Sequence, residues 1–455
     1  MAEPIVGVGP HGLQPSEVID VVRAGYGVKI TPAAHRAMAA SRSHVEESAA
    51  RPDPVYGVST GFGALATLHI APERRGEMQA SLIRSHAAGL GPRVETEVVR
   101  ATMLLRLRTL CTGITGVRPE VAEALCALLN ARLTPLVFEY GSLGCSGDLA
   151  PLAHIALALM GEGDVETKDG SVVAAREAFD TRGITSVVLE DKDGLGLING
   201  TDGMLAGLLL CAYDFRYLCK VADISAAMST EALLGTDVAF RADLVGLRPQ
   251  PGQIASALNL TRLLGGSAVV ASHRSDDPRV QDAYSIRCAP QVAGAARSTL
   301  AHAETVIEEE LAAKIDNPVV LEDGEVVSSG NFHGAPLGYA ADFLAIAAAD
   351  LASIAERRTD RMMDQARSMG LPPFLAGEPG VDSGLMIAHY TQASIVAELK
   401  RLAVPASVDS IPTSAMQEDH VSMGWAATRK LARAIVNLRR VLAIEILAAA
   451  RALEL

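Results

Sequence analysis

The chain of 455 residues carries 49% hydrophobic and 20% charged residues, a balance typical of a globular protein of two to four domains. Its net charge of −13 argues against nucleic acids and anionic membrane surfaces as partners. The six cysteines are scattered without CxxC spacing, which favours reduced thiols and a cytoplasmic location over a disulfide framework. We expect no signal peptide, because the N-terminus has no basic region followed by an apolar core. We expect no membrane span, because the longest apolar stretch is interrupted by Asp342 and Asp350.

The first predicted elements are helices on either side of a glycine-rich loop. Helices are predicted over 32–50, 94–111 and 119–131. Thr31 suits the N-cap of the first helix. The loop 55–63 carries three glycines, two hydroxyl residues and Tyr56, and by itself indicates a turn with a half-buried ring. His86 lies in a Ser-His-Ala-Ala-Gly run, where a lone histidine is more typical of a cap or surface position than of catalysis.

The stretch 141–154 is a run of small residues that leads into an apolar helix, with Asp148 at the expected N-cap. Composition alone favours a glycine-rich loop that caps a buried helix. A serine-hydrolase elbow fails because aspartate stands two residues after Ser146, and a phosphate loop fails because no lysine is present. Backbone cyclisation fits the residues: the Gly147 nitrogen attacks the Cys145 carbonyl, and Ser146 loses water to leave an exocyclic methylidene.

The second half of the chain is predicted to be a helical bundle. Over 165–189 the composition changes and predicts a small β-containing excursion, and Asn199 follows in an Asn-Gly turn. Long stretches with a 3.6-residue apolar period are then predicted as helices over 204–234, 334–363, 391–403 and 418–455. We place a boundary near residue 195, with an N-terminal domain of 1–195 and a helical domain of 196–455. The length of the last helix suggests burial against partner subunits.

Three polar clusters interrupt the predicted helices. Gln281, Tyr284 and Arg287 are spaced three apart, so on a helix they share one face, although a solvated face explains that spacing equally well. Phe332 lies in a loop before a long helix. Glu418 belongs to a Ser-Ala-Met-Gln-Glu-Asp-His run that also fits a capping box with acidic residues in the first helical turn.

Residues 141–154 resemble the signature of the histidine/phenylalanine ammonia-lyase family, and further motifs follow that family in order from Val55 to the last residue. In that family an Ala-Ser-Gly sequence becomes the electrophilic prosthetic group 4-methylideneimidazol-5-one (MIO). The resemblance implies MIO formed here from Cys145, Ser146 and Gly147, with cysteine in place of the usual alanine, and no metal or dissociable cofactor. It also implies a mainly α fold, the long-helix bundle of the fumarase/aspartase-like superfamily with a mixed N-terminal region, and a homotetramer with shared active sites.

The same resemblance implies roles for several side chains. Tyr56 is expected to remove the β-proton, with Tyr284 as the alternative base. Arg287 is expected to pair with the substrate carboxylate through its bidentate fork. Asn199 is expected to hold the amino-acid end of the substrate, and Gln281 to hydrogen-bond near the prosthetic group.

Three further residues bear on the choice of substrate. The family places Phe332 beside the prosthetic group. His86 and the Met-Gln-Glu-Asp-His run around Glu418 resemble the histidine-specific branch, the histidine ammonia-lyases. A carboxylate suits an imidazole, whereas beside a phenyl ring it is a buried charge without a partner. We therefore expect conversion of L-histidine to trans-urocanate and ammonia through a covalent amine adduct with MIO.

Three alternatives stay open. Another MIO enzyme, either a tyrosine or phenylalanine ammonia-lyase or an aminomutase, shares the catalytic residues and differs in its product. A fumarase or argininosuccinate-lyase type of enzyme needs no MIO, but its usual Gly-Ser-Ser-x-Met-Pro loop is not found in the sequence. A helical scaffold without activity predicts an unmodified Ser146.

Overall fold

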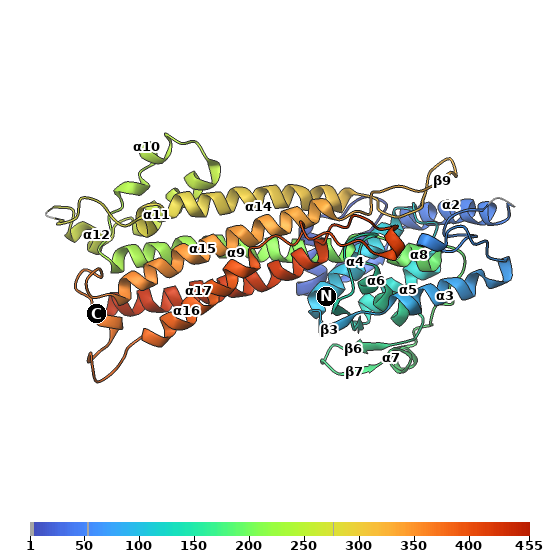
Figure 1. Ribbon diagram of the computed structural model, residues 1–455, viewed down its shortest axis with the longest axis horizontal. Helices are drawn as coiled ribbons and strands as arrows, with labels where there is room; N and C mark the ends of the chain where they lie inside the picture. Colours follow the sequence, from blue (N-terminus) through green and yellow to red (C-terminus); the bar gives the residue numbers. More distant parts are fainter. Residues whose placement is uncertain (1–3, 52–53, 276) are drawn as a thin grey trace. The chain divides into compact units, whose positions relative to one another are not determined.

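The computed structural model describes residues 4–51, 54–275 and 277–455, and these form a mainly helical protein with small accessory sheets (Figure 1). The mainly α fold predicted from the sequence is confirmed. Two compact units divide the chain. Unit 1 comprises Met1–Leu210, Val306–Tyr339 and Ala406–Arg429, and unit 2 comprises Cys211–Thr305, Ala340–Pro405 and Lys430–Leu455. The linear division near residue 195 stays a prediction about folding domains.

The longest buried helix segment of unit 1 lies in α4 (Thr96–Cys111). Every residue of α4 from Val98 to Cys111 is buried, as expected for the core element of a unit. The other helices are α1 (Pro15–Ile19), α2 (Pro32–Ala49), α3 (Arg75–His86), α5 (Pro119–Asn130), α6 (Leu149–Leu159), α7 (Ala175–Arg182) and α8 (Asp193–Ile198). The three predicted helices correspond to α2, α4 and α5. Thr31 caps α2 as predicted, because its hydroxyl accepts the Ala34 N–H at 3.3 Å.

The strands of unit 1 form short ladders. In one sheet, β1 (Ile5–Val8) pairs in parallel with β2 (Gly27–Ile30). The antiparallel ladders are β3 (Leu90–Arg93) with β5 (Phe138–Tyr140), β4 (Thr134–Pro135) with β6 (Asp164–Glu166) and β7 (Val172–Ala174), and β8 (Val319–Val320) with β9 (Val326–Val327). The β-containing excursion predicted over 165–189 is confirmed by β6 and β7, and α7 follows them.

Unit 2 is dominated by long helices. Four helices have residues in both units: α9 (Asp202–Ala232), α14 (Ala289–Ala312), α15 (Ala335–Met363) and α17 (Gly424–Glu454). The remaining helices are α10 (Ala242–Val245), α11 (Pro251–Leu264), α12 (Ala268–Ser272), α13 (Tyr284–Arg287) and α16 (Met386–Leu402). The four predicted long helices correspond to α9, α15, α16 and α17. The last begins at Gly424 rather than at residue 418.

Buried polar contacts connect the long helices of unit 2. Arg358 on α15 and Glu445 on α17 form a buried ion pair, with 3.0 Å between Nη2 and Oε2. Ser229 on α9 donates to the same carboxylate at 2.8 Å. Removing one partner of such a pair leaves an uncompensated charge and typically costs about 3–5 kcal/mol. These contacts therefore align three helices with one another.

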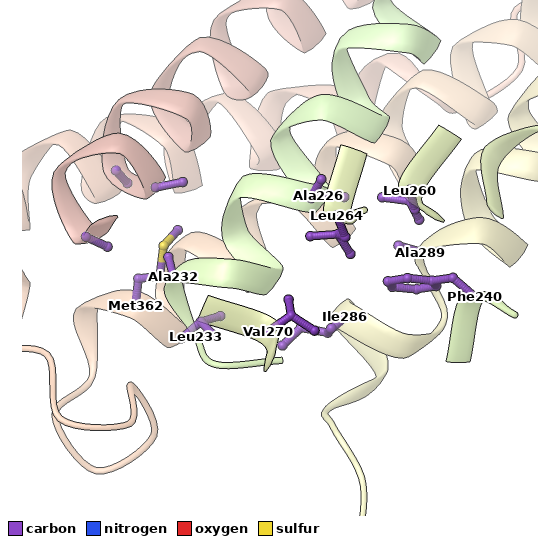
Figure 2. Packing of buried hydrophobic residues seen from close by; sticks show 14 of the residues in the cluster. Ala226, Ala232, Leu233, Phe240, Leu260, Leu264, Val270, Ile286, Ala289 and Met362 are labelled. Atoms are coloured by element: carbon purple, nitrogen blue, oxygen red, sulfur yellow. The ribbon is translucent and has the colours of Figure 1, made fainter. Parts of the chain in front are cut away.

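The apolar core of unit 2 lies around the C-terminal end of α9 (Figure 2). Leu233, Phe240, Leu264, Ile286 and Met362 are all buried there. They come from the residue after α9, the 3-10 turn Val238–Phe240, α11, α13 and α15, so the core joins these five segments. Full burial of side chains of this size stabilises the fold by about 1.5–3 kcal/mol each.

One helix among the residues that the structure describes, α15, has the length and apolar composition of a membrane span. Of its most apolar stretch, 61% is buried inside the protein. A core helix satisfies the same criteria of length and composition.

Candidate active site

The turn that carries Ser146 lies against the residues just before α9 and requires glycine. Gly147 has φ = +78°, and a Cβ at this position lies 2.0 Å from the Gly200 carbonyl oxygen. The two glycines pair as an isolated bridge, and the Asp148 N–H donates to the Gly200 oxygen at 2.7 Å. A larger residue at position 147 therefore displaces the neighbouring segment.

Asn199 is the direct partner of Ser146. The Ser146 hydroxyl donates to Asn199 Oδ1 at 3.0 Å. Asn199 is buried, and its Nδ2 donates to the carbonyl oxygen of Asn317 at 2.5 Å. Because both ends of the amide are engaged, the side chain of Asn199 has one orientation in which all of these bonds form.

Arg106 on α4 holds the backbone of this segment, a role that the sequence analysis missed. The fully buried guanidinium donates to the carbonyl oxygens of Asn199 (2.9 Å) and Ile315 (3.2 Å) and forms an ion pair with Asp202 (3.2 Å). A Cβ on Gly200 lies 2.6 Å from its Nη1, so glycine leaves the space for it. An arginine inside an apolar helical run signals buried partners, but sequence spacing does not identify them.

Asp148 occupies the N-cap position of α6 without capping the helix. Its carboxylate accepts the Met204 N–H (2.8 Å) and the Ser142 hydroxyl (3.0 Å) instead. The predicted side-chain cap is therefore wrong, because the free N–H groups in the first turn of α9 engage the carboxylate. Complete burial raises the pKa of Asp148 to about 7.

A cavity of about 490 Å³ within unit 1 brings five predicted residues together. They are Tyr56, His86, Ser146, Asn199 and Glu418. Apolar side chains form much of the remaining wall, among them Phe62, Met78, Leu149, Leu195 and Ile198. A few convergent polar groups on an apolar wall are typical of a small-molecule site.

His86 offers an unprotonated ring nitrogen. Its Nδ1 lies 2.9 Å from the Leu82 carbonyl oxygen, which can only accept, so we assign the proton of the neutral ring to Nδ1. Burial lowers the pKa of His86 and favours the neutral form. Nε2 is therefore available to accept a hydrogen bond.

Tyr56 and Glu418 each accept a hydrogen bond that helps to orient the side chain. The Gly63 N–H donates to the Tyr56 oxygen at 3.1 Å, and the Thr413 hydroxyl donates to Glu418 Oε2 at 3.0 Å. Between Thr413 and Glu418, all three residues of Ser414–Met416 have left-handed φ angles, from +53° to +69°. The alternative of a helical capping box is therefore wrong, since this backbone turns back on itself and no α-helix begins there.

Cys145, the first residue of the predicted MIO sequence, is buried. Burial and the nearby Glu418 carboxylate raise the pKa of its thiol to about 12. The group stays protonated at neutral pH and is a poor nucleophile.

The predicted face shared by Gln281, Tyr284 and Arg287 is wrong for Gln281, whereas Tyr284 and Arg287 lie on one helix and contact each other. The helix α13 contains only Tyr284–Arg287, and Gln281 precedes it. The physical reason is Asp282, whose carboxylate accepts the Thr236 N–H at 2.7 Å and keeps the chain before α13 out of a helix.

These three residues belong to unit 2 and do not line the cavity of unit 1. Tyr284 is 71% exposed, and the Arg287 guanidinium lies over its ring at 4.4 Å from the centroid. Phe332 is half-buried and is also absent from the cavity wall. Among the described residues that line the cavity, none is arginine or lysine. The described wall of this cavity therefore offers no arginine or lysine to a substrate carboxylate.

Comparison with known proteins relates this geometry to a family. The aromatic amino acid lyase family matches residues 13–455. A histidine ammonia-lyase from Streptomyces coelicolor is 63% identical over 448 residues, which are 98% of this chain and 88% of that protein. The crystal structure of histidine ammonia-lyase from Trypanosoma cruzi has a TM-score of 0.90 at 37% identity, covering 99% of this chain and 85% of that one. A tyrosine aminomutase from Streptomyces globisporus has a TM-score of 0.92 at 37% identity, covering 99% and 88%.

The helical fold and the relatives that share it define the chain as a carbon–nitrogen lyase. The cavity around Ser146 is its candidate active site. The chain belongs to the aromatic amino acid lyase family. The resemblance predicted from residues 141–154 is thereby confirmed.

Proposed function

We propose that this lyase converts L-histidine to trans-urocanate and ammonia. The observation that carries the proposal is that Glu418, an acceptor, and His86, a neutral ring with an available nitrogen, line one cavity with Ser146. An imidazole N–H can donate to either of them. Relatives named histidine ammonia-lyase at 63% identity support the same substrate.

Hydrogen bonding gives this cavity its preference for an imidazole ring. A phenyl ring in the same place offers Glu418 no hydrogen-bond donor beyond those of the protein, such as the Thr413 hydroxyl. Glu418 is half-buried, and a hydrogen bond to a charged group contributes about 1.5–3 kcal/mol. We therefore expect discrimination of roughly 10- to 100-fold in favour of histidine.

The residues of the turn fit the prosthetic group MIO that the family implies. Gly147 has no Cβ to oppose the approach of its nitrogen to the Cys145 carbonyl carbon. Ser146 is the residue that can lose water, and the Cys145 thiol stays protonated and does not compete as a nucleophile. Once formed, MIO supplies an electrophile that makes the substrate amine a better leaving group.

The side chains around the turn orient the substrate and move its proton. Asn199, held by Arg106 and Asn317, positions the amino-acid end beside residue 146. Tyr56 accepts the β-proton on its phenolic oxygen, which the Gly63 N–H keeps oriented. Tyr284 is the alternative base.

We infer a homotetramer in which neighbouring subunits complete the site. Two observations support it: the unit 1 cavity has no cationic side chain among its described lining residues, and Tyr284 is exposed. Arg287 then pairs with the substrate carboxylate, and Gln281 donates near residue 146. Phe332 beside the prosthetic group stays a prediction of the same assembly.

The setting that we propose is the cytoplasm. All six cysteines are free, and five of them are buried. Unpaired thiols are typical of a reducing compartment.

An aminomutase is the second candidate, favoured by the 37% identity to a tyrosine aminomutase. It returns ammonia to the β-carbon and uses the same residues. The sequence and fold are common to both activities, so the product separates them.

The deciding experiment is an ultraviolet time course with L-histidine, with L-tyrosine and L-phenylalanine in parallel. We expect urocanate from histidine, no turnover by Ser146→Ala, and an intact mass for the wild type lower by two waters. A cinnamate or coumarate signal without urocanate contradicts the substrate. A β-amino acid product identifies an aminomutase, and an unreduced mass with no turnover identifies an inactive scaffold.

A further inference from the structure

A second cavity in unit 1, of about 220 Å³, shares no lining residue with the Ser146 site. It lies between the π-helical turn η1 (Asp20–Ala24), the start of α4 and the loop after β6. It adjoins a cavity of about 400 Å³, and both are lined by Gly25, Arg100 and Arg132. The two arginines therefore stand where the two cavities meet.

Among the residues that the structure describes, neither arginine has an acidic partner. Arg100 is 8% exposed and donates to the Leu129 carbonyl oxygen at 3.3 Å, and Arg132 donates to the Gly25 carbonyl oxygen at 3.0 Å. Within the described ranges, neither guanidinium forms an ion pair with a carboxylate. Burial and the proximity of Arg132 lower the pKa of Arg100. Two positive charges thus share one concave site, and neither is bonded to a carboxylate among the described residues, an arrangement that an anion stabilises.

The backbone adopts costly conformations to place Arg132 there. Arg132 itself has φ = +54°, in the left-handed region that a long side chain rarely occupies. The π-helical turn opposite ends at Gly25 with φ = +77°, and a Cβ on Gly25 lies 2.4 Å from Arg132 Nη2. π-Helical turns are rare and frequent at functional sites. The left-handed φ of Arg132 and the π-helical turn are backbone features, distinct from the charges of the side chains. Both lie at the same cavity.

The remaining polar groups of the cavity make it a donor-rich site. Lys168 and the buried Thr134 contribute to its wall. The one carboxylate among its described lining residues, Glu166, accepts from the Thr96 hydroxyl at 2.7 Å. Arg23 also lines the cavity and pairs with Glu97, which does not. Arg100, Arg132 and Lys168 thus outnumber Glu166 within a chain whose net charge is −13.

We propose that this cavity binds a phosphate group, held between Arg100 and Arg132. Arginine forks match the geometry of a tetrahedral oxyanion, and a phosphate offers three terminal oxygens, enough for both guanidinium groups and Lys168. The adjoining cavity has Tyr26, Val28 and Leu129 in its wall and gives room for the organic part of a phosphate monoester. The source is therefore either inorganic phosphate or a small monoester.

The test is isothermal titration of the full-length protein with inorganic phosphate, with glycerol phosphate and with malonate, at constant ionic strength in chloride. Arg132→Asn is the main variant, because asparagine tolerates a left-handed φ. Arg100→Gln is the second. Arg182→Gln is the matched control, since Arg182 also donates to a carbonyl of this turn, that of Ala131, but does not line the cavity.

We expect each cavity variant to weaken phosphate binding by about tenfold or more, and the control to stay within about twofold. Tighter binding of glycerol phosphate than of phosphate, lost in the same variants, identifies a monoester as the source; equal binding identifies free phosphate. Unchanged affinity in both cavity variants overturns the site. Stronger binding of malonate than of either phosphate compound, lost in the same variants, overturns the ligand class.

Discussion

The segment around Ser146 and the segment 281–287 are held by the chain in different ways. The Ser146 hydroxyl donates a hydrogen bond to the buried Asn199 side chain. The backbone carbonyl of Asn199 in turn accepts a hydrogen bond from the buried Arg106 of α4. In the other segment Asp282 is buried and anchored, whereas Gln281 and Tyr284 are exposed and Arg287 rests on the face of the Tyr284 ring.

This difference follows the chemistry that each segment is proposed to perform. Backbone cyclisation at residues 145–147 involves only atoms of one chain, so its geometry is built into one unit. A carboxylate clamp acts only when substrate is present, and the half-buried Arg287 meanwhile donates to the Asp282 carbonyl oxygen at 3.1 Å. The comparison therefore separates residues needed to form the prosthetic group from residues needed only for turnover.

The largest effect is expected from Arg106→Met, which removes a buried support of the segment around Ser146. It leaves Asp202 and the carbonyls of Asn199 and Ile315 without their partner, and lowers the free energy of unfolding by about 3–5 kcal/mol. We also expect that a smaller fraction of the folded protein has lost the two waters that cyclisation at residues 145–147 releases. Urea unfolding and intact mass measure the two effects.

Arg108→Met is the matched control, since Arg108 lies on the same buried helix and donates to Glu310 and Ala313 carbonyl oxygens without contacting Asn199. It should lose stability and keep full dehydration. Equal dehydration of the two variants contradicts the role given to Arg106.

Arg287→Gln tests the exposed side. We expect kcat/KM for histidine to fall by roughly 100-fold, because a charge-assisted bidentate pair is lost, while the intact mass stays that of the dehydrated protein. Steady-state kinetics and mass spectrometry on one preparation give both readouts. Arg274→Gln, at an exposed ion pair of the same unit, is the control. If Arg287→Gln also fails to lose the two waters, the proposed distinction between the two segments is wrong.

Glu418→Gln sharpens the comparison within the cavity. We expect roughly a tenfold loss of kcat/KM on histidine and a smaller loss on phenylalanine, because the amide still accepts a hydrogen bond but carries no charge. Asp419→Asn serves as control, since Asp419 is exposed and does not line the cavity. Equal losses on both substrates contradict ring recognition by Glu418.

The smallest effect concerns pH. Because burial lowers the pKa of folded His86 below its ordinary 6.5, the unfolded chain takes up a proton first as the pH falls. This contribution to stability is complete above about pH 6.5 and is lost below it, levelling off once the folded ring is also protonated. Urea midpoints between pH 5 and pH 8 should therefore fall less steeply with acid in His86→Gln than in the wild type. If the urea midpoint falls more steeply with acid in the variant, the pKa of folded His86 is raised rather than lowered.

Much of the candidate site could be predicted because its signals are local. Gly147 after Ser146 is a backbone requirement that survives in the structure as a positive φ and a contact that excludes any Cβ. The cavity also joins Tyr56, His86 and Glu418, which are far apart in sequence and were linked only by their resemblance to a family. The role of Arg106 was not predicted, and Asp148 was wrongly predicted to cap α6 with its side chain. Each of these contacts depends on a partner that sequence spacing does not reveal.

By itself, the sequence determined the helical class, the cap on α2, the β-containing excursion and the glycine turn at Ser146, because caps, periods and small residues act over a few neighbouring positions. Only the tertiary structure decided that the carboxylate of Asp148 serves α9, that Gln281 leaves the helix of Arg287, and that Arg106 joins α4 to Asn199. These outcomes depend on which distant segments satisfy buried polar groups, and that competition is settled only when the whole unit packs.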